Sequence, residues 1–505
     1  MTIPFSLTRQ PRSSWRARIG SSVRTPALLL FPLVIYLALP SRNFYWDGVL
    51  FAILIERKPP AAALAHPNHF IYTLWGSWLY NLSAWIGFPT RALYLMQIAN
   101  CLLAGLAVML LYRCLRSAGW SSEHGLMAAL TFGFSAEWWK FATDVDAYIP
   151  AIFLLLCVYL LLGHPRMTLL AALTHAAATL FHELAILFLP VALLLLWKRR
   201  RSAMAGMMQI AAYCLAAFAP VAIAYVWAYR SVFPGGTPGG LFGWITTRSP
   251  GSVFTFNPFS DVYYTLRGTL RLFFGGRVGA LLRDPLTAAA GVLLACAVLA
   301  FLFYARRALP ATRPPLALPP NALLLWAGVY AGFLFFWMPQ NTFYRLFYLA
   351  PLILVVAMAL PDVPALHRAG FWFATVLFLW NFVFLTYPES RPEFNAPLRF
   401  ALAQHDAWPS GSTIVFQRFH PDLWTISYFN PQAEWKELNR ADLTQLDRDL
   451  AQARSQKEPL WLEETAYELL TADSAGRQWL AVHERPDRLV RFKDEKHAFV
   501  FHCIL

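Results

Sequence analysis

The chain has 505 residues, of which 58% are hydrophobic and only 14% are charged, and its formal net charge is +14. A soluble domain carries about 25% charged residues, so the composition excludes a purely soluble protein and places most of the chain in a lipid bilayer. Of the 28 acidic residues, 18 follow Tyr387, so the part of the chain before Tyr387 carries the excess of positive charge. There the basic residues lie in loops between apolar runs, as membrane topology requires, and this distribution argues against a nucleic-acid partner.

The N-terminal segment has the charge of a cytoplasmic tail. Residues 1–24 contain five arginines and no acidic residue, and an apolar run over residues 25–40 follows them. No small-residue cleavage motif stands at the end of that run, so we predict an uncleaved first span with residues 1–24 as a cytoplasmic basic tail.

Two kinds of loop alternate between the later apolar runs. Short loops rich in arginine and lysine stay in the cytoplasm, so the acidic loops between them face outward. The basic loops contain Arg113 and Arg116, Arg166, Lys198 to Arg201, Arg306, Arg307 and Arg313, and Arg368. The acidic loops contain Asp47 and Glu56, Glu137, Asp144 and Asp146, Glu183, and Asp261 and Asp284.

This alternation predicts an α-helical polytopic membrane protein with about eleven transmembrane helices within residues 25–387. We expect it in the bacterial cytoplasmic (inner) membrane, with a cytoplasmic N-terminus. The predicted spans lie near residues 25–40, 92–112, 124–138, 147–163, 167–182, 184–198, 206–229, 286–305, 321–338, 346–360 and 370–387.

Two predicted outer loops, residues 41–91 and 231–285, are too long to be simple turns. The first contains an apolar stretch from Phe70 to Ile86, which we interpret as a helix at the membrane interface because it is rich in tryptophan and tyrosine. Counting it as a span would invert every later loop. The second begins with a Pro/Gly hinge and continues into an amphipathic helix with Arg267 and Arg271 on one face.

After Tyr387 the composition becomes that of a soluble domain. We predict that residues 388–505 form a small α/β domain outside the cytoplasm, without a recognisable catalytic signature. Alternating and capped patterns predict strands at 413–416, 489–492 and 497–503, and a helix at 442–455 capped by Asp442.

Three carboxylates lie in the outer loops next to the ends of predicted spans. Asp47 follows the first span, and Asp144 and Asp146 precede the fourth. Carboxylates at the mouth of a helical bundle can act as general bases or hold a divalent cation such as Mg²⁺ or Mn²⁺. The alternative is that they are solvated or paired with nearby cations such as Arg42 or Lys140.

Histidines and a further acid form two weaker candidates for substrate binding. His182 and Glu183 interrupt two apolar runs, and ionisable groups near hydrocarbon usually face a cavity, although an ordinary outer turn also explains them. His66 and His69 flank a Pro-Asn pair and can supply hydrogen bonds or bind a metal, although a capping turn explains them about as well.

Arginines near the outer span ends are candidates for binding phosphate. Arg345 lies between the ninth and tenth predicted spans, and its fork-shaped guanidinium suits a pair of phosphate oxygens. Arg267 offers the same chemistry. Interaction with lipid head groups is the common alternative for all such arginines, and it is the favoured reading of Arg267 and Arg271.

The order of these features resembles the GT-C superfamily of membrane glycosyltransferases, which includes protein O-mannosyltransferases and aminoarabinose lipid A transferases. The resemblance covers about residues 25–390. It lies in an Asp after the first span, a long first outer loop, a second acidic motif between the third and fourth spans, a long outer loop after the seventh span, an arginine before an aromatic and proline-containing span, and a C-terminal outer domain. Several relatives carry Lys-Gly-Pro where this chain has His182-Glu183-Leu184, and the resemblance leaves metal dependence open.

The resemblance implies a GT-C-like fold and transfer of a sugar from a polyprenyl-phosphate-linked donor to an acceptor hydroxyl. Asp47 would be the base, with Asp146 as a second catalytic candidate, and Arg345 or His182 would stabilise the leaving phosphate. The complete set of candidate substrate-binding residues is Arg345, His182, Glu183, His66, His69, Asp144 and Arg267.

Two other functions fit a multi-pass protein of this composition. A transporter or flippase of a lipid-linked sugar is expected to carry ionisable groups near the bilayer midplane and often two related halves, whereas here the charges gather at the outer edge. A non-catalytic assembly subunit would use the outer domain to bind a partner. The acceptor class, whether glycan, lipid or protein, is open in the sequence.

Overall fold

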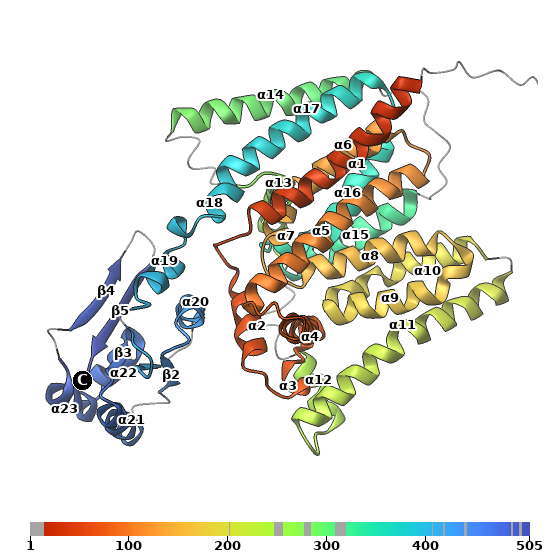
Figure 1. Cartoon of the computed structure of the whole chain (residues 1–505). Coiled ribbons are helices and arrows are strands. Elements are labelled where there is room, and N and C mark those ends of the chain that lie inside the picture. Colours follow the sequence, from red (N-terminus) through yellow and green to blue (C-terminus); the bar gives the residue numbers. More distant parts are fainter. Residues whose placement is uncertain are drawn as a thin grey trace, which may run out of the picture.

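The computed structural model describes residues 15–200, 202–246, 256–276, 284–308, 320–406, 408–417, 420–438, 442–485, 488–493 and 497–504. Most of the predicted basic tail (residues 1–14), parts of the second outer loop (247–255 and 277–283), and Arg201 and Arg313 of the basic loops lie outside the described residues. The described residues form a large helical bundle and a smaller C-terminal α/β domain (Figure 1).

Helices occupy the apolar runs predicted from the sequence, and some runs are broken into two. The predicted span at 124–138 divides at Phe134 and Ser135, and the one at 184–198 begins with a 3-10 helix, η3 (Glu183–Phe188). The bundle helices are α1 (Trp15–Ala38), α5 (Ala92–Ser117), α6 (Ser122–Gly133), α7 (Ala136–Ala142), α8 (Tyr148–Leu162), α9 (Thr168–Phe181), α10 (Leu189–Lys198), α11 (Ala203–Val232), α14 (Pro285–Ala308), α15 (Pro320–Trp337), α16 (Leu346–Ala359) and α17 (Pro364–Asn381).

Within the described residues, five helical segments are long and apolar enough to cross a membrane. They are Ala92–Ser117, Ala203–Val232, Pro285–Arg307, Pro320–Trp337 and Pro364–Glu389. Three shorter apolar segments, Thr25–Ala38, Tyr148–Leu162 and Phe343–Ala359, accompany them. A polytopic helical membrane protein is confirmed, and the count of about eleven spans stays a prediction.

The core of the bundle lies where α5, α6, α8 and α16 meet. Apolar side chains from each helix are almost fully buried there, for example Val108, Leu130, Leu155 and Leu349. These helices carry apolar residues around most of their circumference, as expected for helices that contact other helices or lipid on every side. Their packing fixes the ends of the helices, where the polar side chains lie.

The first outer loop folds into short helices against the end of the bundle where α5 begins. It contains α2 (Trp46–Glu56), α3 (Ala61–Leu64), η1 (Pro67–His69) and α4 (Tyr72–Trp85). The predicted interfacial helix is α4: Tyr72 and Gly76 are buried towards the protein, whereas Trp85 is 82% exposed. The second outer loop contains α12 (Pro238–Thr246) and α13 (Pro258–Phe273), and α13 packs against α7 and α15.

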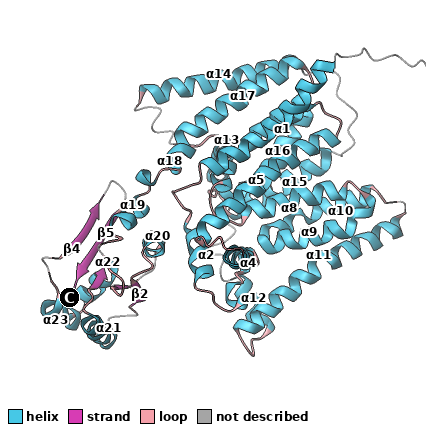
Figure 2. Ribbon diagram, viewed as in Figure 1, coloured by secondary structure: helices cyan, strands magenta, loops and turns pink. Residues whose placement is uncertain are grey.

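The C-terminal domain holds every strand among the described residues (Figure 2). Its sheet has the order β2-β1-β3-β5-β4, with β1 parallel to β2 and β3, and β5 antiparallel to β3 and β4. The strands are β1 (Thr413–Phe416), β2 (Glu434–Glu437), β3 (Leu460–Glu463), β4 (Leu489–Lys493) and β5 (Ala498–Cys503). The helices are α19 (Ala396–Ala403), α20 (Pro421–Phe429), α21 (Leu443–Gln456), α22 (Glu464–Ala472) and α23 (Ser474–His483).

The predicted strands β1, β4 and β5 are confirmed, as is the helix capped by Asp442, whose carboxylate accepts a hydrogen bond from the Gln445 amide of α21. β2 and β3 were not predicted. Each has four residues, and β3 is buried along its whole length, so neither shows the alternation that marks a half-buried strand.

The domain attaches to the bundle at the end that carries α2. Glu56 at the end of α2 accepts hydrogen bonds from the Tyr428 hydroxyl (2.6 Å) and from Arg91 Nε (3.0 Å). The carbonyl of Glu389, after α17, accepts hydrogen bonds from the Arg42 and Asn43 amides. The C-terminal domain and the first outer loop therefore lie on the same side of the bundle.

Candidate functional site

The loop between α7 and α8, which carries Asp144 and Asp146, is held by amide side chains of α5. Asn100 Nδ2 donates to the carbonyls of both Asp144 and Asp146, each at 2.9 Å. Gln97, almost one turn earlier, donates to the Thr143 carbonyl at 3.0 Å. The sequence analysis missed both amides, and the available signal was their position as polar residues inside an apolar helix.

Asp144 joins this loop to the start of α2. Its fully buried carboxylate accepts hydrogen bonds from the backbone amides of Tyr45 and Val145, both at 2.8 Å. Burial raises the pKa of Asp144 to about 6, and these two hydrogen bonds and the charge of Lys140 oppose the rise. The two hydrogen bonds fix the carboxylate of Asp144 in place, and its role in substrate binding stays a prediction.

Gly48 allows α2 to contact the same loop directly. A Cβ atom at this position would lie 2.5 Å from the Val145 carbonyl oxygen and 2.8 Å from the Val145 Cβ atom, closer than any side chain permits. Because Asp47 precedes Gly48, this close approach of the two backbones brings Asp47 next to Asp146.

Asp47 and Asp146 have different electrostatic environments. Burial raises the pKa of Asp47 to about 7. The pKa of Asp146 is also raised, first by burial and then by the charges of Asp47 and Asp144. Neither oxygen of Asp146 finds a hydrogen-bond partner among the described residues. Two neighbouring carboxyls with raised pKa values can serve as base and proton donor near neutral pH.

Three predicted histidines lie together beside these acids. The ring centroids of His69 and His182 are 4.7 Å apart, and His66 stacks on His69 at 5.7 Å. The ring of Tyr148, which begins α8 two residues after Asp146, lies 5.0 Å from that of His182. His66 also caps η1 through the amide of Asn68, as the alternative interpretation expected.

Tyr344 joins the acids to an apolar groove. Burial raises the pKa of Tyr344, and the charges of Glu183, Asp146 and Asp47 raise it further. Its ring stacks on Trp337 at 5.4 Å. Trp337 and Glu183 both line a cavity of about 780 Å³, with Thr179, Leu184, Ile186, Leu187, Phe218, Val221, Ala222, Tyr225, Val226, Leu241, Ile245 and Phe333.

Arg345 is held by groups other than the three carboxylates. Its side chain is fully buried, and its guanidinium donates to the Pro339 carbonyl (2.6 Å) and to the Tyr348 hydroxyl (2.9 Å). Gly268 of α13 lies directly against the guanidinium. Arg267 is exposed on the same helix. The predicted phosphate contact of Arg345 therefore requires α13 to move, and the roles of both arginines stay predictions.

Binding of a divalent cation by Asp47, Asp144 and Asp146 stays a prediction. Among the described residues, one group of three side chains brings metal-ligating atoms within 4.8 Å of one another, and it consists of His124, Asp362 and His367. The sequence analysis did not identify that group, because His124 lies more than 230 positions before Asp362 and His367 in the chain.

Comparison with solved structures shows that the chain has the GT-C fold of membrane glycosyltransferases. The similar structures include ArnT from Cupriavidus metallidurans bound to undecaprenyl phosphate, with a TM-score of 0.57, 12% identity, and coverage of 96% of this chain and 98% of that chain. The apo state of the same protein gives a TM-score of 0.59 at 11% identity, covering 97% and 98%. No protein-family model matches the sequence, and no curated protein matches it.

Proposed function

We propose that this protein is an integral membrane glycosyltransferase that moves a sugar from a polyprenyl-phosphate-linked donor to an acceptor hydroxyl on the outer face of the membrane. The proposal rests on an apolar groove lined by Glu183 and Trp337, on the stacking of Tyr344 against Trp337, and on the influence of Asp47 and Asp146 on the pKa of Tyr344. A donor with an apolar tail and an anionic head needs these two environments side by side. The similar ArnT structure is bound to a polyprenyl phosphate, which supports this donor class.

Asp47 is the general base of the proposed reaction. Its carboxylate takes the proton from the acceptor hydroxyl while the hydroxyl oxygen attacks the anomeric carbon of the donor sugar. The bond between the anomeric carbon and the phosphate oxygen breaks, and the phosphate leaves with the bonding electrons. Asp146, whose pKa is raised by burial and by the charges of Asp47 and Asp144, is the second proposed catalytic residue, and its protonated carboxyl donates a hydrogen bond to the bound substrate.

The leaving phosphate needs positively charged or hydrogen-bonding partners. Among the described residues, His182 Nε2 is buried and has no hydrogen-bond partner, and it faces the same aromatic cluster as Tyr344. It is the candidate partner that requires no movement of a helix. Arg345 becomes available only when α13 moves away.

The apolar groove is the proposed site of the polyprenyl chain. Replacing Ala222, which lines it, by tryptophan would fill part of its volume of about 780 Å³. We expect Ala222→Trp to raise the KM for the polyprenyl donor about tenfold with kcat nearly unchanged, because the groove contacts the part of the donor that does not react. Leu215→Trp is the matched control, since Leu215 is 70% exposed on the same helix and outside the groove. Equal KM values for the two variants would argue against this assignment.

A transfer assay separates the proposed activity from the alternatives. Radiolabelled polyprenyl-phosphate sugars are offered, with membrane extract as the acceptor source, to the wild type, to Asp47→Asn and to Glu393→Gln. We expect transfer to fall by at least about 100-fold in Asp47→Asn. Glu393 is an exposed acid on the same side of the bundle, and its substitution should leave transfer unchanged. Full activity of Asp47→Asn would reject the mechanism, and absence of transfer with every donor would favour a non-enzymatic protein.

A further inference from the structure

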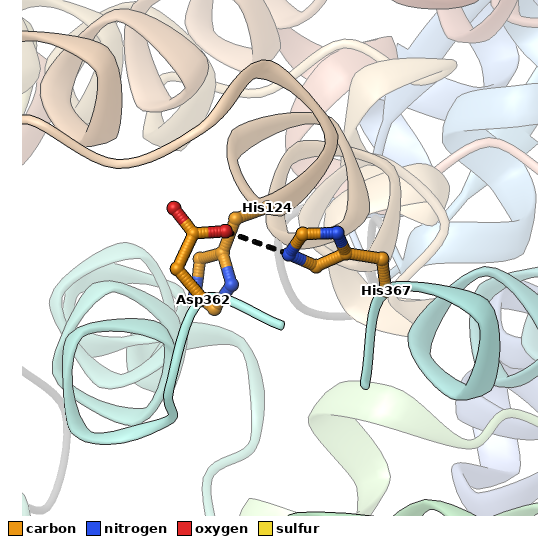
Figure 3. A group of neighbouring side chains, drawn as sticks. All are labelled: His124, Asp362 and His367. Atoms are coloured by element: carbon orange, nitrogen blue, oxygen red, sulfur yellow. Dashed lines mark hydrogen bonds and ion pairs between the residues drawn. The ribbon is translucent and has the colours of Figure 1, made fainter. Parts of the chain in front are cut away.

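Two histidines and an aspartate converge at the end of the bundle away from the acids. His124 lies in the first turn of α6, His367 in the first turn of α17, and Asp362 in the linker between α16 and α17. Their side chains point toward one another (Figure 3), and one ligating atom from each lies within 4.8 Å of the others. Asn100 of α5 contacts the acidic loop, and α5 ends 17 residues later at Ser117, just before Ser121, which binds Asp362. Seventeen helical residues span about 25 Å, so the cluster lies about 25 Å from the proposed active site.

His124 has the hydrogen-bonding pattern of a metal ligand. Its Nε2 lies 2.8 Å from the Ala357 carbonyl oxygen, which can only accept, so Nε2 carries the proton and Nδ1 presents a lone pair. This Nδ1 atom is fully buried and has no partner among the described residues. Histidines that bind metals usually donate their second ring N–H to a carbonyl or carboxylate in this way. An acceptor nitrogen buried without a donor is otherwise costly.

Hydrogen bonds also fix the carboxylate of Asp362 in an orientation that suits a metal ligand. Its two oxygens accept hydrogen bonds from the Ser121 hydroxyl (2.5 Å) and the Ser121 amide (2.6 Å). His367 Nε2 donates to Asp362 Oδ1 at 2.7 Å. A proton therefore occupies the position between two of the three ligating atoms.

We propose that His124 Nδ1, His367 Nε2 and Asp362 Oδ1 bind a Zn²⁺ ion. Two imidazole nitrogens and one carboxylate oxygen are a donor set that suits Zn²⁺, and water completes the tetrahedron. Binding replaces the proton between His367 and Asp362, which is released, so metal uptake weakens as the pH falls. Zn²⁺ ligands lie about 3.3 Å apart in a tetrahedral site. On binding, the His367 and Asp362 atoms, now 2.7 Å apart, would separate by roughly 0.6 Å, and ligating atoms up to 4.8 Å apart would approach by up to roughly 1.5 Å.

The ion would fix the start of α6 to the linker between α16 and α17. Ser121 already joins these parts, since it caps α6 and binds Asp362. The site is separate from the proposed transfer chemistry, because its three ligands lie at the opposite end of the helices that carry the acidic loop. Its role is to hold three helices in register at that end.

The test measures bound metal in the purified full-length protein. The wild type, His124→Ala, His367→Ala and His164→Ala are incubated with ZnCl₂, passed through a desalting column and analysed by mass spectrometry for zinc. His164 is the matched control, since it is an exposed histidine at the end of α8. We expect about one retained zinc per chain in the wild type and His164→Ala, and less than about a fifth of that in the two site variants.

Spectroscopy of the wild type decides the question even when a site variant fails to fold. Co²⁺ in a tetrahedral site of nitrogen and oxygen ligands gives visible d–d absorption, which added Zn²⁺ abolishes. Absence of these bands, or equal zinc contents in the wild type and both site variants, would overturn the proposal and leave a His–Asp hydrogen bond that only joins the helices. Glycosyl transfer is not a readout here, so the outcome is independent of the proposed function.

Discussion

The pH dependence of transfer tests the assignment of Asp47 as the base. Burial raises the pKa of Asp47 from 3.8 to about 7. Because the base must be ionised, activity is present above this pKa and is lost as the pH falls through it. At pH 5, two units below, only about 1% of Asp47 is ionised, so kcat/KM should fall roughly 100-fold from its plateau. With an ordinary carboxyl pKa the loss at pH 5 would be below about 10%.

The assay is the initial rate of transfer at a donor concentration below KM, from pH 5 to pH 9 at constant ionic strength. Under these conditions the profile reports the free enzyme. Asp146→Asn is the companion variant, and its midpoint should stay within a few tenths of a unit of the wild type, because burial is the cause of the raised pKa of Asp47. A flat wild-type profile between pH 5 and pH 8 would refute the reasoning.

Two further predictions concern the contacts that position Asp47. Gly48→Ala places a Cβ atom 2.5 Å from the Val145 carbonyl oxygen. We expect it to cost about 1–3 kcal/mol of stability and to lower transfer at least tenfold, measured by thermal unfolding and by the transfer assay; wild-type behaviour in both would contradict the proposed close approach. Tyr428→Phe removes the hydroxyl that donates to Glu56 at 2.6 Å. We expect faster proteolytic release of the C-terminal domain and a loss of about 1 kcal/mol, whereas unchanged cleavage would show that other contacts hold the domain.

The sequence predicts which carboxylates gather at the outer end of the bundle, but not what each one does. Asp144 and Asp146 are two residues apart and look equivalent in the sequence. In the structure, Asp144 is bound by the backbone amide of Tyr45, nearly one hundred positions earlier, whereas Asp146 has no hydrogen-bond partner among the described residues. The difference arises from the packing of the start of α2 against the loop, and the local sequence around Asp144 and Asp146 carries no information about that packing.

Arg345 and His124 also show that contacts between distant helices are not readable from the sequence: Arg345 was predicted as a site residue and His124 was not. The guanidinium chemistry of Arg345 suggested a phosphate contact, yet the packing of Gly268 against it depends on where α13 lies. His124 begins a predicted span, and the sequence gives no sign that it belongs to a site. Its partners Asp362 and His367 approach it only because α6 and α17 pack together. Helix periodicity gives the elements and their apolar faces, while pairings between distant helix ends come from tertiary packing.

The short helix α2 contacts a different part of the molecule at each of its ends. At its start, Tyr45 and Gly48 are fixed to the acidic loop of the bundle, and at its end Glu56 is fixed to Tyr428 of the C-terminal domain. The eleven residues of α2 therefore link that domain to Asp47, which lies in the first turn of the helix. An acceptor that docks on the C-terminal domain would therefore be coupled through α2 to Asp47, the proposed base.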